Sequence, residues 1–264
     1  SSTINLPTDL WLPTTKKVKP QTSHQFALGG VYKVNREIDF SIEGFYKSMT
    51  NLLEYKEGAS FVGATTGWED KVELGKGWSY GAEFLLEKTI GKTTGWIGYT
   101  WSKAERQFDN LNWGRKFYAR YDRRHDVSFV MTHRFSKRFD VGLTWVYGTG
   151  NAVTLPTQNV NAAYIPYINQ FSYQPNYEYF GQRNNYRMPS YHRMDVGFNF
   201  HKQKKHGVRT WNLSFYNAYS RQNPFFLYFE QTSEAEYNQT GKSRKLTQLS
   251  LFPIIPSISY SYKF

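Results

Sequence analysis

Apolar and polar residues alternate one by one along much of this chain. In the segment 191–200, every second residue from Met194 onward is apolar: Met194, Val196, Phe198 and Phe200. Because successive side chains of a strand point to opposite faces, this period predicts strands with one apolar and one polar face. The pattern predicts nine such segments: 24–34, 38–55, 78–90, 94–108, 125–136, 139–155, 191–203, 208–230 and 250–264. No segment has a convincing helical period, and we therefore predict an all-β fold.

The connections between these segments alternate in length. Short turns fall near residues 35–37, 91–92, 136–138 and 204–207, and long connections span 56–77, 109–124, 156–190 and 231–249. This alternation is typical of an antiparallel transmembrane β-barrel with tight periplasmic turns and long outer loops. A soluble sheet with one wet face is the alternative. Several predicted strands are longer than the usual five or six residues, which favours the membrane barrel.

The number of strands bears on whether the barrel is complete. If the short turns are periplasmic, the first and ninth strands run in the same direction and cannot pair with each other antiparallel. Bacterial single-chain barrels have an even number of strands. We therefore predict that residues 1–264 form one partial barrel domain, the C-terminal part of a larger barrel that other strands complete.

Composition excludes several classes of function. The chain has a formal net charge of +12, but its basic residues are scattered, and we predict no nucleic-acid partner. There is no cysteine, which excludes disulfides and thiolate catalysis. The six histidines form no HxH or HExxH pattern, so we predict neither a metal site nor a cofactor. The Asp122–Asp126 run lacks the convergent geometry of a catalytic triad, and we predict that the protein is not an enzyme.

Seven stretches of the chain carry a resemblance to a known family. They are "LPTDLWLPTTKKVKPQTSHQFALG" (6–29), "NLLEYKEGASF" (51–61), "GWSYGAEFLLEKTIGKTTGWIGYTWS" (77–102), "YARYDRRHDVSFV" (118–130), "WVYGTGNAVTLP" (145–156), "YNAYSRQNPFF" (216–226) and the ending "FPIIPSISYSYKF". These stretches resemble the barrel portion of TonB-dependent outer-membrane receptors of the SusC-related, carboxypeptidase-regulatory-like kind. The resemblance implies a barrel of about 22 strands whose lumen holds a plug domain. This chain has no plug and no TonB box in its own residues.

The resemblance also implies a function and partners. It implies energised uptake of a scarce nutrient (an iron chelate, vitamin, glycan or peptide) across the outer membrane of a Gram-negative bacterium. The expected partners are the remaining strands and plug of the same receptor, the TonB complex, outer-membrane lipids and a surface lipoprotein acting as a lid. Two alternatives stay open: a non-transporting barrel that serves as a structural or assembly platform, and a soluble carbohydrate-binding β-protein.

Aromatic residues in the long connections are the candidates for ligand binding. Rigid aromatic side chains between polar neighbours form adaptable binding surfaces. The candidates are Trp113, Tyr118, Tyr164, Tyr167, Phe171, Tyr173, Tyr177 and Tyr179. The alternative is that these rings pack on one another and order a long loop. The Gly-Thr-Gly stretch at 148–150 lacks the context of a phosphate loop, and we interpret it as close packing at the barrel mouth.

Charged residues on the predicted polar faces are expected to line the lumen or to hold a plug. A basic residue on the lipid face would cost about 2–4 kcal/mol at the midplane of the bilayer. The lumen candidates are Glu43, Lys47, Glu83, Asp126, Arg134, Arg193 and Asp195. The alternating aromatic residues at the C-terminus, Tyr260, Tyr262 and Phe264, resemble the signal that the barrel-assembly machinery recognises.

Overall fold

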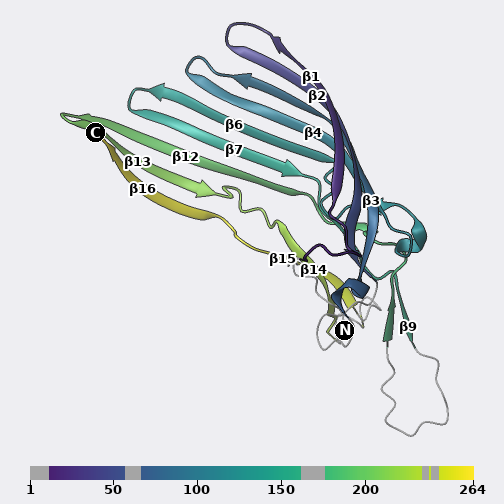
Figure 1. Cartoon of the computed structure of the whole chain (residues 1–264). Coiled ribbons are helices and arrows are strands. Elements are labelled where there is room, and N and C mark those ends of the chain that lie inside the picture. The colour runs from purple at the N-terminus through teal and green to yellow at the C-terminus, as the bar shows by residue number, and fades with distance from the viewer. Residues whose placement is uncertain (1–11, 57–66, 162–175, 234–237, 239–243) are drawn as a thin grey trace, which may run out of the picture.

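The computed structural model describes residues 12–56, 67–161, 176–233, 238 and 244–264. Within these residues the fold is all-β, and no helix has the length and apolar character needed to cross a bilayer. One curved antiparallel sheet dominates (Figure 1), with nine long strands in the order β1-β2-β3-β4-β6-β7-β12-β13-β16. Their bounds are β1 (Thr22–Lys33), β2 (Ile38–Tyr55), β3 (Val72–Lys88), β4 (Thr93–Gln107), β6 (His125–Ser136), β7 (Phe139–Gly148), β12 (Tyr191–Lys204), β13 (Gly207–Tyr216) and β16 (Ile255–Lys263).

The smaller elements lie in the long connections. Short β5 (Phe117–Tyr118) pairs with β4 inside the main sheet. Three two-stranded ladders stand apart from the main sheet, and two short 3-10 helices precede β3 and β5. Their bounds are β8 (Ala152–Val153), β9 (Gln158–Asn161), β10 (Asn176–Tyr179), β11 (Tyr186–Arg187), β14 (Pro224–Gln231), β15 (Arg244–Ser250), η1 (Trp68–Lys71) and η2 (Asn112–Gly114). All long connections leave from one end of the sheet, called here the loop end; the opposite end is the turn end.

All nine predicted segments contain strands, but four predicted boundaries were wrong. The strand predicted from residue 78 already starts at Val72. The segment 208–230 is two strands, because Asn217 and Ser220 adopt left-handed φ angles of 51° and 52° and end β13. The strand predicted for 139–155 ends at Gly148. The strand predicted from residue 250 starts at Ile255, after Phe252 at a φ of 57°.

Strand register separates the two faces of the sheet across its whole width. One row of directly opposed residues crosses five strands and is entirely apolar: Leu86, Ile97, Phe129, Trp145 and Met194. We call this side the apolar face. A row on the other side, the polar face, contains Glu43, Glu83, Thr100 and Asp126. The alternation predicted within single strands is therefore aligned between neighbouring strands.

The apolar face is not covered by other parts of the described chain. Large side chains on this face remain open to the surroundings, for example Leu28 with 85% and Ile258 with 70% of the residue surface exposed. A continuous exposed apolar surface of this extent marks an interaction with a membrane or a partner. Because this surface belongs to every strand of the sheet, the arrangement favours lipid as its environment over the soluble alternative.

The edges of the sheet are formed by β1 and β16. Each pairs on one side only within the described residues, β1 with β2 and β16 with β13. Eight antiparallel steps separate the two strands, so they run in the same direction. As predicted from the sequence, they cannot close on each other as an antiparallel pair, and the described sheet is one part of a barrel wall.

Arginine substitutions at two adjacent residues of β6 test the assignment of the faces. Phe129→Arg places a charge on the apolar face near the middle of the strand, and we expect it to lower the free energy of unfolding by about 2–4 kcal/mol. Ser128→Arg, on the polar face, is the matched control and should change it by less than about 1 kcal/mol. Urea unfolding in lipid vesicles measures both. A larger loss for Ser128→Arg would mean that the faces are reversed.

Candidate functional site

A bulge near the loop end of β2 changes the direction of its side chains. The register shifts between Thr50 and Leu52, and the extra residue, Asn51, has a φ of 56°. Asparagine tolerates this left-handed conformation better than most residues. A bulge inverts the alternation beyond it, so Leu52 and Glu54 lie on the polar face, where an unbroken alternation would turn them to the apolar face.

The side chain of Leu52 joins a small buried cluster on the polar face. The cluster consists of Leu52, Phe108, Leu111 and Phe117, and the rings of Phe108 and Phe117 stack at 6.0 Å. Gly75 lies beneath it, where an added Cβ would be 2.3 Å from the Phe108 ring. Burial of each large apolar side chain contributes about 1.5–3 kcal/mol. The cluster therefore holds the connection between β4 and β6 against the polar face at the loop end.

The carboxylate of Glu54 connects three segments of the chain. It accepts hydrogen bonds from Arg106 at 3.2 Å and from Arg183 at 3.2 Å. Arg183 also donates to the backbone oxygen of Tyr55 at 3.1 Å, and its backbone N–H donates to Asn112 at 2.9 Å. These contacts fix the segment after β10 against the ends of β2 and β4.

A second network surrounds Asp122, whose side chain is completely buried. Its carboxylate pairs with Arg187 at 2.6 Å and Arg124 at 3.3 Å, and it accepts the Ala104 backbone N–H at 2.6 Å. Arg187 also donates to the backbone oxygen of Gly150 at 3.0 Å. A buried carboxylate with three donors of this kind holds its loop firmly. We call the Glu54 and Asp122 networks, with the apolar cluster, the rim.

The Gly-Thr-Gly stretch at 148–150 lies within this rim. An added Cβ on Gly150 would be 1.9 Å from the backbone oxygen of Met188, so only glycine fits there. The interpretation as close packing at the mouth is confirmed.

Three of the predicted ligand-binding residues have described side chains. Trp113 is 63% exposed, Tyr179 is 49% exposed and Tyr118 is 39% exposed. Three cationic groups face the ring of Tyr118: those of Arg124 and Arg187 at 5.5 Å and that of Lys103 at 5.8 Å. Tyr118 is thus part of the rim, and its role in ligand binding stays a prediction.

The remaining ligand-binding candidates cannot be placed as side chains. Tyr177 lies in the short strand β10. Tyr164, Tyr167, Phe171 and Tyr173 lie outside the described residues.

The lumen candidates all lie on the polar face by strand register. They are Glu43, Lys47, Glu83, Asp126, Arg134, Arg193 and Asp195. The register reveals two cross-strand neighbours that the sequence did not predict. Glu43 lies directly opposite Glu83, and Arg134 lies directly opposite Asp140. Asp126 pairs with Arg123 at 3.1 Å.

Arg193 is the centre of an ordered cluster near the loop end of the polar face. It pairs with Asp195 at 2.9 Å and donates hydrogen bonds to the hydroxyls of Tyr191 at 3.0 Å and Tyr216 at 2.7 Å. Asp195 also accepts the backbone N–H of Asn217 at 2.9 Å, which connects the cluster to the turn after β13. The alternating pattern placed Arg193 and Asp195 on the polar face but could not identify the two tyrosines as their partners.

A ladder of hydrogen-bonded side chains around the carboxylate of Asp140 continues the polar face toward the turn end. Asn199 donates to Asp140 at 2.8 Å and accepts from Asn212 at 2.8 Å. His201 completes the ladder through Asp140 and the hydroxyl of Thr210, at 2.5 Å and 2.9 Å. The sequence pattern gave the face of these residues but not their hydrogen bonds.

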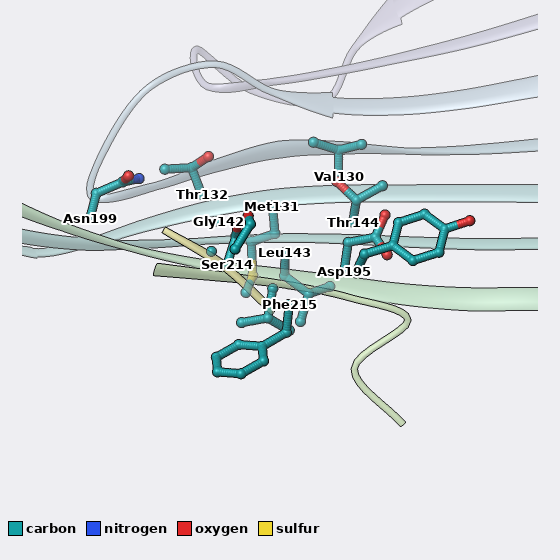
Figure 2. A pocket seen from close by; sticks show the side chains of 14 residues that line it. Val130, Met131, Thr132, Gly142, Leu143, Thr144, Asp195, Asn199, Ser214 and Phe215 are labelled. Atoms are coloured by element: carbon teal, nitrogen blue, oxygen red, sulfur yellow. Dashed lines mark hydrogen bonds between the residues drawn. The ribbon is translucent and has the colours of Figure 1, made fainter. Parts of the chain in front are cut away.

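A shallow hollow of about 350 Å³ lies on the polar face between the Arg193 cluster and this ladder (Figure 2). Its base is the directly opposed pair Gly142 and Gly197, and an added Cβ on Gly142 would meet no atom within 4 Å. Thr132, Thr144 and Ser214 surround it, so hydroxyl groups line an open surface. The hollow is open to its surroundings and is not an enclosed ligand pocket.

The C-terminal aromatic residues lie on the outer side of the edge strand. Tyr260 and Tyr262 are 54% and 39% exposed, Phe264 is 97% exposed, and the ring of Tyr260 contacts Trp211 at 4.9 Å. Their role as an assembly signal stays a prediction. Within the described residues no three His, Asp or Glu side chains form a group that could hold a metal ion.

The sequence of the chain matches the model of a known family. The family model "TonB dependent receptor-like, beta-barrel" matches residues 3–219. The chain belongs to this family. TonB-dependent receptors are outer-membrane proteins of Gram-negative bacteria, and they are transporters rather than enzymes. No curated protein matches the chain.

Two solved structures to which parts of the chain are similar are described as iron transport proteins. The ferric-catecholate import receptor Fiu from E. coli K12 matches with a TM-score of 0.49 and 15% identity, covering 80% of this chain and 25% of that chain. The FrpB iron transporter from Neisseria meningitidis matches with a TM-score of 0.49 and 15% identity, covering 80% of this chain and 29% of that chain. The chain therefore spans less than a third of the length of either receptor.

Removing the carboxylate of Asp122 tests the rim. We expect Asp122→Ala to leave two guanidinium groups without their shared partner and to destabilise the rim by about 1–3 kcal/mol. Hydrogen exchange of segments 119–124 and 183–188 should then accelerate by about tenfold or more. Asp126→Ala, which removes a carboxylate with one exposed partner, is the control and should leave both segments protected. Equal exchange in the two variants would contradict the role of Asp122.

Proposed function

We propose that the chain is the C-terminal part of the barrel wall of a TonB-dependent receptor that takes up a scarce nutrient with energy relayed by TonB. One observation supports this most strongly: nine strands present a continuous polar face inside a continuous apolar face, and the rim folds over the polar face at the loop end. A platform that only anchors other proteins would not require a polar inner wall closed by such a rim. The wall has no covalent chemistry to perform.

In this proposal the remaining strands and a plug domain are supplied by other residues of the same receptor. The seven charged lumen candidates then face the plug or the ligand path. Glu43 and Glu83 support this in particular, because they are directly opposed and pair with no cation among the described residues. Like charges directly opposed on neighbouring strands are destabilising. A basic side chain of the plug between them would remove this repulsion.

Exposed aromatic residues at the loop end are the proposed first contact for the nutrient. Trp113, Tyr118 and Tyr179, with the further tyrosines of the connection 156–190, are proposed to make first contact with the ligand at the outer mouth. The SusC-related, carboxypeptidase-regulatory-like subtype is proposed from the sequence resemblance and would favour a glycan or a peptide over an iron chelate or a vitamin. That subtype would also bring a surface lipoprotein as a lid.

Uptake by the full-length receptor tests the proposed function. Cells that carry the receptor should take up a nutrient from a panel of labelled glycans, peptides, vitamins and iron chelates, and uptake should stop when either the receptor or TonB is deleted. Uptake that persists without TonB would contradict energised transport. Normal uptake of the whole panel without the receptor, together with the loss of an outer-membrane complex, would favour the structural platform.

Charge reversal in the lumen tests the contact with the plug. We expect Glu43→Lys combined with Glu83→Lys in the full-length receptor to weaken plug retention, because two carboxylates that attract the plug become repulsive. The plug should then be cut by protease at least several times faster in intact outer membranes. Glu37→Lys, at the turn between β1 and β2 and outside the lumen, is the control for charge reversal; it removes the ion pair of Glu37 with Lys88 at that turn. Unchanged protection in the double variant would exclude these residues from the plug contact.

A further inference from the structure

The apolar face of β3 has clear limits. Its apolar-face residues run from Trp78, near the loop end, to Lys88, which pairs with Glu37 at the turn end. Ten residues of strand span about 33 Å. At the usual tilt of about 40°, this length corresponds to the apolar band of about 25 Å that outer-membrane barrels present to lipid. Trp78 therefore marks the boundary between acyl chains and head groups on the loop-end side.

Three lysines gather at this boundary on the same face. Lys103 lies directly opposite Tyr80 in the register of β3 and β4. Lys76 is one apolar-face position beyond Trp78 and is exposed. The Nζ atom of Lys116, from the segment before β5, lies 4.2 Å from the centre of the Trp78 ring. Residues 40 apart in the chain thus bring their cations to one part of the outer surface.

The charges of this patch do not cancel. Glu105, opposite Trp78, pairs with Lys103 at 2.9 Å. No carboxylate in the described part of the chain pairs with Lys76 or Lys116. The patch therefore carries about two uncompensated positive charges at the edge of a low-dielectric band, where attraction between charges is stronger than in water.

Aromatic rings form a platform beside these cations. Tyr80 contacts Trp101 edge to face at 6.1 Å, and Trp78 lies under the ammonium group of Lys116. Aromatic rings at this depth fix the position of a barrel relative to the head groups, and lysine side chains extend their ammonium groups toward the water. Directly below the platform, Phe84 and Leu86 continue the same face into the acyl region.

We propose that Lys76, Lys103 and Lys116 form a binding site for the phosphate groups of a phosphorylated glycolipid in the outer leaflet. Charge complementarity selects a phosphate, and the apolar surface directly below it selects a molecule that also carries acyl chains. A free phosphate ion would use only the first of these features. The site lies outside the barrel, so it does not depend on the proposed uptake function.

Lipid retention by the full-length receptor tests this site. The receptor is placed in nanodiscs of phosphatidylethanolamine with a small fraction of bis-phosphorylated lipid A, and bound lipid A is counted by native mass spectrometry. We expect the combined Lys76→Gln, Lys103→Gln and Lys116→Gln variant to retain lipid A at least about tenfold less well, because each lysine near a charged membrane surface adds to the attraction. Lipid A without its phosphates should bind the parent and the variant equally weakly.

A control variant has Lys202→Gln and Lys204→Gln, two exposed lysines of the same face at the turn end. It should retain lipid A as the parent does. Equal retention in the triple variant and the parent would overturn the proposal. It would also fail if inorganic phosphate bound the solubilised parent, displaced lipid A and lost its binding in the triple variant, since the site would then serve a free anion.

Discussion

The register between neighbouring strands is the constraint on which the rest of this structure depends. A strand shows its two faces in alternation, so a slip of one residue would exchange them along its whole length. In the row from Leu86 in β3 to Met194 in β12, the pairing brings apolar residues opposite apolar residues on all five strands. One such slip in β6 would place Ser128 and Thr132 against lipid and Phe129 in the lumen. The bilayer therefore selects the register, and the register creates the polar wall.

The irregularities of the sheet lie where this constraint is relaxed. The bulge in β2 falls at its loop end, and the bulge in β6, between Arg134 and Ser136, falls at its turn end. Neither interrupts the alternation within the apolar band. Beyond the apolar band, an inversion of the two faces does not expose polar side chains to acyl chains. The β2 bulge turns Leu52 and Glu54 inward, and these two side chains anchor the apolar cluster and the Arg183 contacts of the rim. The one extra residue of the β2 bulge, Asn51, thus allows the loop end of the sheet to form the rim.

The sequence predicted the wall much better than the mouth. A period of two is a local property, so the nine strands and the faces of residues such as Glu83 and Arg193 followed from short segments. The rim depends on contacts between distant segments: Arg183 lies 129 residues from Glu54, and Arg187 lies 65 residues from Asp122. No local pattern encodes such pairs. Strand ends were also missed, because asparagine at position 217 permits a left-handed turn without requiring one.

The two edges of the sheet show why this wall cannot act alone in a bilayer. Unpaired N–H and C=O groups cost several kcal/mol each in hydrocarbon, so a membrane sheet must close. Since β1 and β16 run in the same direction, only an odd number of additional strands can close the wall and keep every pair antiparallel. The segment before β1 lies at the loop end, where Lys17 pairs with Asp70 at 3.4 Å. A strand added there would reach β1 through a loop-end connection, as β2 reaches β3. The alternation of short and long connections then continues beyond the described strands. The lumen stays on the polar face, the rim stays at the loop end, and the lipid-facing lysines stay on the apolar face.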